Sequence, residues 1–327
     1  PTKHEHGRSI KINKTKLRRV VSEAMICAED ELGISDDHAG IMVLPSDTTP
    51  GIPSSELISS YQDSVIEIAI TPNRPDATSH IGVARDLSAK WGTPLTVPTV
   101  TIPDQVANQG TNFTISIEDP QKCSRYVGVV MENIQVSPSP AWLKNRLEAI
   151  GLRSINNIVD VTNYVMYEWG QPLHAFDANN LKGSSIHVKS FAEPYDFTTL
   201  DGVTRKVPVG SLFICDDEQA VAIAGIMGGE NSEVSESTTT IVLESAYFDP
   251  STIRKCSKQL SLQTDASYRF ERGIDSNIQL TAAIRAADLI KEMIPEALIT
   301  ETIDLHPIPK KSLELSLRVS RVHQILG

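Results

Sequence analysis

The stretch "SINNIVDVTNYVMYEWGQPLHAFD", residues 154–177, contains the features on which the fold and the function depend. Its first part, 154–170, is apolar at helical spacing and ends at Gly170, a residue type that commonly terminates helices. We predict a helix there, followed by a loop that carries His174. Such a histidine could be a catalytic base, a metal ligand, an RNA contact or a structural residue, and a lone loop histidine is most often structural.

The composition is that of a folded, soluble protein. The chain has 327 residues, 40% of them hydrophobic and 22% charged, which suits two or three domains. No apolar run reaches the roughly 20 residues of a membrane span, no signal peptide opens the chain, and the first residue is Pro1 instead of Met. The four cysteines are far apart and form no CxxC pair, so neither a zinc site nor a disulfide framework is expected. We expect a cytoplasmic protein without membrane association, cut from a longer chain.

The charge is unevenly distributed along the chain. A formal net charge of −11 at pH 7 argues against a protein that binds nucleic acid over its whole surface. Residues 1–19 are basic nonetheless, and such an edge could contact phosphates. The candidate contacts are Lys11, Lys14, Lys16 and Arg18. On charge alone, a solvated strand face explains this edge equally well.

Strand patterns and capped helices indicate a multidomain α+β fold. Three prolines in 93–110 indicate a linker between domains. We predict four segments: short strands at 1–45, a small α+β domain with its linker at 46–110, a β-rich module with flanking helices at 111–300, and a linker with the start of a further, truncated domain at 301–327.

Local signals predict several individual elements. Ser139 is expected to cap a helix that starts at Pro140 and stops at Gly151. The stretch "SVIEIAI" (64–70) is expected to be a strand. The tail "SLELSLRVSRVHQILG" (312–327) is expected to be a strand followed by the start of a helix.

Glu244 interrupts the apolar strand pattern "IVLESAYF" (241–248). Side chains alternate between the faces of a strand, so this carboxylate shares a face with apolar neighbours. A charge buried there needs a partner, because burying it unpaired is costly. The partner could be a polar ligand or a structural arginine, Arg153 or Arg269, and the sequence leaves both open.

Two further motifs have ordinary explanations. The loop "AGIMGGEN" (224–231) lacks the Gly-Lys-Ser/Thr of a P-loop and is not GxGxxG, so a nucleotide-phosphate site is disfavoured. Glycines in such a loop more often allow the backbone to lie close to a ligand or to another strand. In "LQTDASYRFERG" (262–273), Thr264 is expected to cap a helix that begins with salt bridges.

Four stretches follow one another along nearly the whole chain: "TPNRPDATSHIGVARDLSA", "GLRSINNIVDVTNYVMYEWGQPLHAFD", "AIAGIMGGENSEVSESTTTIVLESAYF" and "LQTDASYRFERGID". Together they resemble the β subunit of bacterial phenylalanyl-tRNA synthetase. The resemblance implies that 111–300 is an editing module, which hydrolyses tyrosine mischarged onto phenylalanine tRNA. It also implies that 1–45 is the end of an OB-like tRNA-binding domain. The alternative is a non-catalytic fragment that binds tRNA and serves as a scaffold.

The same resemblance assigns residues to an editing pocket. Catalytic roles fall to His174, Glu244 and Arg153, and substrate contacts to Pro172, Gly228, Thr264 and Ala266. His174 would position the attacking water or the terminal ribose, or act as general base, while Arg153 would hold the terminal adenosine or its phosphate. Glu244 would accept a hydrogen bond from the hydroxyl group that distinguishes tyrosine from phenylalanine. With phenylalanine bound it would lie unpaired, at a cost of ~1–3 kcal/mol.

Partners and cofactors are implied in the same way. Phenylalanine tRNA and the synthetase α subunit are the expected partners, in an α2β2 assembly. ATP and Mg²⁺ would serve the aminoacylation site on the α subunit, and no metal or cofactor is expected in this chain. A metal hydrolase built on His174 and Glu244 is disfavoured, because no second histidine lies at ligand spacing.

Overall fold

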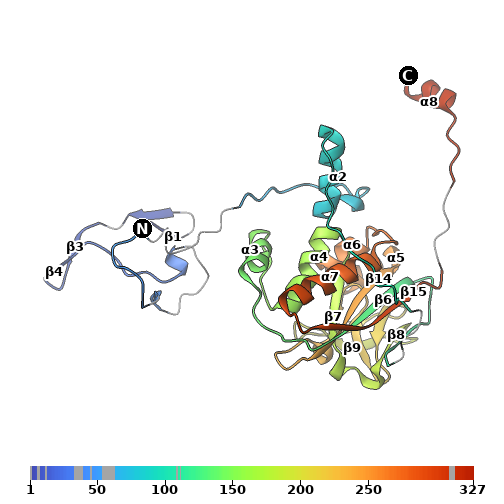
Figure 1. Ribbon diagram of the computed structural model, residues 1–327. Helices are drawn as coiled ribbons and strands as arrows, with labels where there is room; N and C mark the ends of the chain where they lie inside the picture. Colours follow the sequence, from blue (N-terminus) through green and yellow to red (C-terminus); the bar gives the residue numbers. More distant parts are fainter. Residues whose placement is uncertain are drawn as a thin grey trace. The chain divides into compact units, whose positions relative to one another are not determined.

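The computed structural model divides the chain into two compact units, residues 1–64 and 65–327 (Figure 1). It describes every residue except 1, 6–7, 12, 33–39, 45, 54–62, 108–109, 111 and 309–313. Within the described residues, no helix is both long and apolar enough to cross a membrane.

Among the described residues of the first unit, the strands form two antiparallel hairpins. They are β1 (Thr2–Glu5) with β2 (Arg8–Lys11), and β3 (Thr15–Leu17) with β4 (Val20–Ser22), followed by the 3₁₀ turn η1 (Asp30–Leu32). The second hairpin turns through Arg18 and Arg19, whose φ angles of 47° and 73° lie in the left-handed region. Positive φ at both turn positions matches the twist of paired strands. These hairpins confirm the short strands predicted near the N-terminus, and their place in an OB-like domain stays a prediction.

The second unit contains α-helices and strands, with a run of strands from β8 to β14 that no α-helix interrupts. In chain order the elements are η2 (Pro75–Ala77), α2 (His80–Trp91), β5 (Thr114–Ile117), β6 (Cys123–Glu132), α3 (Ala141–Ala149), α4 (Asn157–Trp169), β7 (Leu173–Asp177), η3 (Ala178–Asn180), η4 (Lys182–Ser184), β8 (Ser185–Ser190), β9 (Tyr195–Thr198), β10 (Thr204–Val207), β11 (Leu212–Cys215), β12 (Ala220–Ile223), β13 (Met227–Gly228), η5 (Glu230–Ser232), β14 (Thr240–Phe248), α5 (Pro250–Leu260), α6 (Asp265–Phe270), α7 (Gln279–Met293), β15 (Leu298–Leu305) and α8 (Val319–Leu326).

The strands in the described part of this unit form two sheets and one hairpin. The four-stranded sheet is antiparallel throughout, in the order β15-β6-β14-β7. The five-stranded sheet has the order β13-β12-β11-β8-β5, and only its β5–β8 pair is parallel. The strands β9 and β10 form the hairpin. These sheets and helices together confirm the predicted α+β class.

The four-stranded sheet has a hydrophobic core on each face. Val129 of β6 and Leu243 of β14 belong to a core shared with α3, α4 and α7, and we call this side of the sheet the helix-side face. Val130 and Val242, which are adjacent to Val129 and Leu243 in sequence, belong to a core shared with the five-stranded sheet, α5 and α6, on what we call the inter-sheet face. Figure 1 shows α4 and α7 beside the strands that they cover. Burial on both faces stabilises β6 and β14, because apolar side chains on each side of these strands are removed from water.

Local capping signals define α4 as the sequence predicts. The Asn156 side chain accepts hydrogen bonds from the N–H groups of Ile158 and Val159 at the start of the helix. Gly170 ends it with a φ of 83°, in the left-handed conformation that favours glycine. The predicted stop at Gly170 is therefore confirmed.

Ser139 does not cap α3, so that prediction is wrong. The N-cap position holds Pro140, which offers no side-chain bond. Ser139 Oγ instead donates to Asp160 Oδ2 at 2.6 Å, and Ser154 Oγ and the Ile155 N–H donate to the same carboxylate. Asp160 is fully buried, and its need for hydrogen-bond donors outweighs one helix cap.

Two predicted strands are not formed. Residues 64–70 form no strand and Val65 and Ile66 are exposed, because no neighbouring strand among the described residues pairs with this segment. In the tail, residues 314–318 form no strand, while 312–313 lie outside the described residues. The helix predicted at the end of the tail is present as α8.

The segment around His174 is a strand, so the prediction of a loop is wrong. Leu173–Asp177 forms β7, the edge strand that pairs with β14 in the four-stranded sheet. The strand has five residues, and it begins directly after Gln171 and Pro172. So short a segment shows no clear strand pattern in the sequence. Pairing with a strand far along the chain makes this segment a strand.

Candidate functional site

Strand pairing brings His174 and Glu244 together. They are directly opposite each other in the antiparallel pair β7–β14. Residues opposite each other in such a pair present their side chains on the same face of the sheet. Phe176 and Val242, the next pair on that face, belong to the inter-sheet core. The imidazole and the carboxylate therefore both lie on the inter-sheet face.

Gly228 lies against the ring of His174. A Cβ atom on Gly228 would lie 2.8 Å from Cε1 and 3.0 Å from Nε2 of His174, and 3.1 Å from Cδ1 of Leu200. Real Cβ atoms essentially never approach another atom within 3.0 Å, so a side chain at position 228 would require the imidazole or the backbone of β13 to shift. The Gly228 carbonyl accepts a hydrogen bond from the Leu200 N–H at 3.1 Å, which fixes the backbone there.

His174 has a buried nitrogen without a partner. Its Nε2 atom is sealed from solvent and makes no hydrogen bond with any described residue. The ring packs edge-on against Phe176, with centroids 4.5 Å apart. Burial lowers the pKa of His174 to about 4, so the imidazole is neutral near pH 7. The second nitrogen of a neutral imidazole is a hydrogen-bond donor or acceptor, and in His174 this capacity is unused by the described residues.

Glu244 is buried and its partner is a tyrosine. The Tyr126 hydroxyl donates to Glu244 Oε2 at 2.6 Å. The alternative of a structural arginine is therefore wrong: Arg269 pairs with Asp265, and Arg153 is exposed and makes no ion pair with Glu244. Burial raises the pKa of Glu244 to about 7, against the opposing effect of the Tyr126 hydrogen bond. The carboxyl group thus titrates in the physiological range.

Thr264 connects the start of α6 to the segment that carries Gly228. Its Oγ1 accepts from the Ser267 N–H at 3.1 Å, and this confirms the predicted cap. The same hydroxyl donates to the Ile226 carbonyl at 2.9 Å, two residues before Gly228. Ala266, half-buried on α6, packs against the inter-sheet core. These contacts bring the predicted substrate residues of α6 to the same face as His174.

A buried amide pair holds the start of β7. Gln171 Nε2 donates to the Pro172 carbonyl at 2.9 Å and to the Ala246 carbonyl of β14 at 3.0 Å. Gln279 of α7 donates in turn to Gln171 Oε1 at 2.9 Å. Both glutamines are fully buried, and Pro172 is buried beside them. Neither amide stands out in the sequence, because their partners lie on distant elements.

Arg153 and the basic N-terminal residues are not part of this cluster. Arg153 is exposed between α3 and α4 and makes no hydrogen bond with His174 or Glu244. In the first unit, Lys16 and Arg18 are exposed, and Lys14 forms an ion pair with Glu23. Lys11 belongs to β2, and its side chain lies outside the described residues. Their assignments to tRNA stay predictions.

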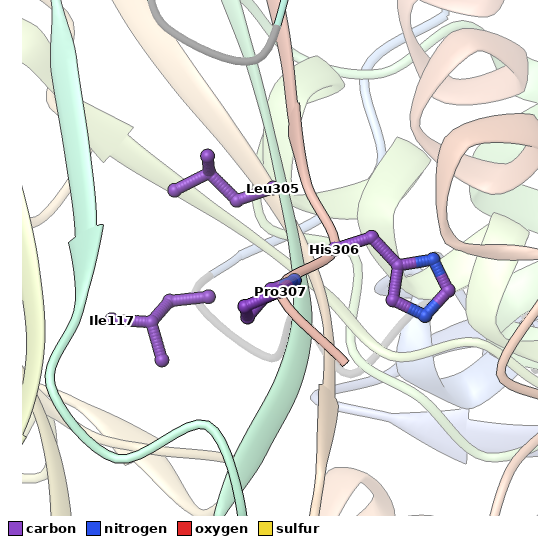
Figure 2. A pocket seen from close by; sticks show the side chains of 4 residues that line it. All are labelled: Ile117, Leu305, His306 and Pro307. Atoms are coloured by element: carbon purple, nitrogen blue, oxygen red, sulfur yellow. The ribbon is translucent and has the colours of Figure 1, made fainter. Parts of the chain in front are cut away.

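A separate hollow lies where β5 and the end of β15 meet. It has a volume of about 380 Å³ and is lined by Ile117, Leu305, His306 and Pro307. Figure 2 shows that the His306 ring points away from the space that Ile117 and Leu305 face. None of the predicted site residues lines it. Among the described residues, no group of three or more His, Cys, Asp or Glu side chains could hold a metal ion.

Comparison with known proteins gives consistent matches. A family model described as "B3/4 domain" matches residues 122–295, more than half of the chain. The phenylalanine–tRNA ligase beta subunit of Salinibacter ruber is 48% identical over 100% of this chain, and that of Geobacter sulfurreducens is 46% identical over 97%. In both cases the chain spans 40% of the relative's length.

A solved N-terminal fragment of the phenylalanyl-tRNA synthetase beta subunit from Pyrococcus horikoshii is only distantly similar. It is 13% identical with a TM-score of 0.37, covering 71% of this chain and 60% of that one. The region that the B3/4 domain model matches, 122–295, includes His174, Gly228 and Glu244. The chain belongs to the B3/4 domain family, and over its whole length it is similar to part of the phenylalanine–tRNA ligase beta subunit.

Proposed function

We propose that this chain carries an editing site, which hydrolyses tyrosine wrongly esterified to phenylalanine tRNA. The observation that supports this most is the direct pairing of His174 and Glu244 across β7 and β14, with the Gly228 backbone against the imidazole. A buried carboxyl group, a neutral imidazole and a close backbone together suit the recognition of a polar ring and an ester. Arg153, which is exposed between α3 and α4, would hold the terminal adenosine or its phosphate.

Glu244 is the proposed selector between tyrosine and phenylalanine. The two amino acids differ by one hydroxyl, which an apolar synthetic pocket rejects only modestly. A carboxylate oxygen would accept a hydrogen bond from the tyrosine hydroxyl. Since Tyr126 already satisfies Oε2, phenylalanine would leave only the other oxygen unpaired. The penalty for phenylalanine is therefore smaller than for a carboxylate with no partner at all.

His174 is the proposed holder of the attacking water. An aminoacyl ester is reactive enough that a well-placed water contributes much of the rate. The unpartnered Nε2 would accept a hydrogen bond from that water or from the terminal ribose. Because its pKa is lowered to about 4, the ring is a weak base. A role in orienting the attacking water is therefore favoured over a role as the general base that removes a proton from that water. Pro172, Thr264 and Ala266 would line the remaining walls.

The whole-protein context is also proposed from the relatives. They are named phenylalanine–tRNA ligase beta subunit, and the chain spans 40% of the length of the first two. The chain would act in the cytoplasm within a synthetase that contains an α subunit and binds phenylalanine tRNA. ATP and Mg²⁺ would serve the aminoacylation site of that subunit. Phosphate contacts would come from Lys11, Lys14, Lys16 and Arg18 in the first unit.

The test uses tyrosyl and phenylalanyl esters of the same phenylalanine tRNA. The chain, alone and within the full synthetase, should release tyrosine much faster than phenylalanine. Glu244→Gln should lose that preference, and His174→Ala should slow the release of tyrosine. Glu148→Gln, which changes an exposed carboxylate on α3, should behave as wild type. If neither preparation releases tyrosine, the region is a non-catalytic tRNA-binding scaffold and the proposal fails.

A further inference from the structure

We propose that Tyr126 is a positioning residue that holds the Glu244 carboxyl group and thereby sets the preference of the site for a phenolic side chain. This inference rests on the proposed function. The Tyr126 hydroxyl donates to Glu244 Oε2 at 2.6 Å, and Tyr126 is fully buried. The internal phenol therefore makes with Glu244 the kind of contact that a bound tyrosine would make with the other oxygen.

The sheet fixes the geometry of this contact. Glu244 lies opposite Gly128 of β6, while Tyr126 lies opposite Ala246, so the two side chains are diagonal neighbours on one face. Gly128 contributes no side chain between them. A Cβ there would meet Cδ1 of Ile115 at 2.5 Å, so this face has no room for one. Both strands are central in the sheet, which leaves the phenol and the carboxyl group little freedom to separate.

Tyr126 is the principal polar contact of Glu244. Among the described residues, no other hydrogen bond and no ion pair reaches the carboxyl group. The titratable groups facing it are Tyr126 and Cys123 from β6 and His174 from β7. Burial raises the pKa values of the Tyr126 hydroxyl and the Cys123 thiol, and burial lowers that of His174, so all three are neutral near pH 7. The phenol alone opposes the burial that favours the protonated carboxyl group.

Loss of this phenol changes what Glu244 presents to a substrate. Without the donor, Glu244 binds a proton more readily, because burial disfavours its charged form. A protonated carboxyl group left beside phenylalanine costs less than an ionised one, so discrimination falls. The side chain also loses the contact that fixes its rotamer. Tyr126 thus determines both which oxygen is available and how much of the carboxyl group is ionised.

The experiment measures binding of tyrosinamide and phenylalaninamide by calorimetry, from about pH 5 to about pH 9. Wild type should prefer tyrosinamide increasingly as pH rises, with a midpoint near the Glu244 pKa of about 7. Tyr126→Phe should lose about tenfold of this preference at neutral pH and move the midpoint upward. Tyr164→Phe, which removes a phenol hydroxyl on α4 that accepts from Arg146, should match wild type.

A second substitution covers the case in which Tyr126→Phe does not fold, as judged by thermal unfolding. A fluorinated tyrosine at position 126 keeps the shape and strengthens the donor, so the midpoint should move downward. If the midpoint and the preference stay at their wild-type values in every folded variant, Tyr126 is only structural and the inference is overturned. If wild type itself shows no preference and equals Glu244→Gln, the proposed function fails instead.

Discussion

The two faces of the four-stranded sheet are both buried, but burial has opposite consequences on them. At the middle of the helix-side face, Val129 and Leu243 pack against helices and carry no charge. On the inter-sheet face, burial shifts the pKa values of Tyr126, His174 and Glu244 away from their ordinary values. Leu243 and Glu244 are adjacent in sequence, so β14 presents an apolar core residue on one face and a buried titratable group on the other. Buried titratable groups of this kind often mark functional sites.

Truncation on the helix-side face should give the largest effect on stability. Leu243 is fully buried, so Leu243→Ala removes apolar contacts and leaves a cavity. We expect a loss of about 2–5 kcal/mol in the free energy of unfolding, measured with denaturant. Leu298→Ala, at a leucine that is 53% exposed on β15, should lose far less. Equal losses would contradict the assignment of the core. The preference for tyrosine should survive in the folded fraction.

The inter-sheet face should show two opposing pH dependences. The pKa of Glu244 is raised in the folded protein, so its contribution to stability is complete below the ordinary value of 4.5 and is lost as pH rises to about 7. The pKa of His174 is lowered, so its contribution is complete above 6.5 and is lost as pH falls to about 4. Each effect amounts to roughly 3 kcal/mol at most, and in wild type they largely cancel.

Single substitutions should separate these two contributions. Relative to wild type, Glu244→Gln should become more stable as pH rises from about 4 to about 7, because only the histidine term remains. His174→Gln should become less stable over the same range. Thermal unfolding at several pH values measures both. Parallel curves for the two variants would show that the groups do not titrate as described.

Filling the space beside His174 should have an intermediate effect. In Gly228→Ala, the new methyl group meets the imidazole at 2.8 Å, so the ring or β13 must shift. We expect a loss of stability of about 1–3 kcal/mol and a larger loss of tyrosine release. Gly40→Ala is the control, because a Cβ there meets nothing within 4 Å. Unchanged release in Gly228→Ala would mean that the histidine does not need its observed position.

The sequence predicts the local parts of this site but not its pairings. The cap at Thr264 and the stop at Gly170 follow from short-range chemistry and are confirmed. The need of Glu244 for a partner is also predictable from its apolar surroundings. The identity of that partner is not, because Tyr126 lies 118 residues away and looks like any other strand tyrosine. His174 is assigned to a loop for the same reason, since only its pairing with β14 makes it part of a strand.

The smallest effect should come from Thr264, which separates capping from recognition. Thr264→Val keeps the shape but loses both the hydrogen bond from the Ser267 N–H and the one to the Ile226 carbonyl, so we expect a loss of about 1 kcal/mol. Thr264→Ser keeps the hydroxyl and should remain close to wild type. If the hydroxyl only anchors α6, the preference for tyrosinamide should change little in either variant. A selective loss of that preference in Thr264→Val would instead place the hydroxyl in contact with the substrate, and it would extend the polar part of the inter-sheet face to α6.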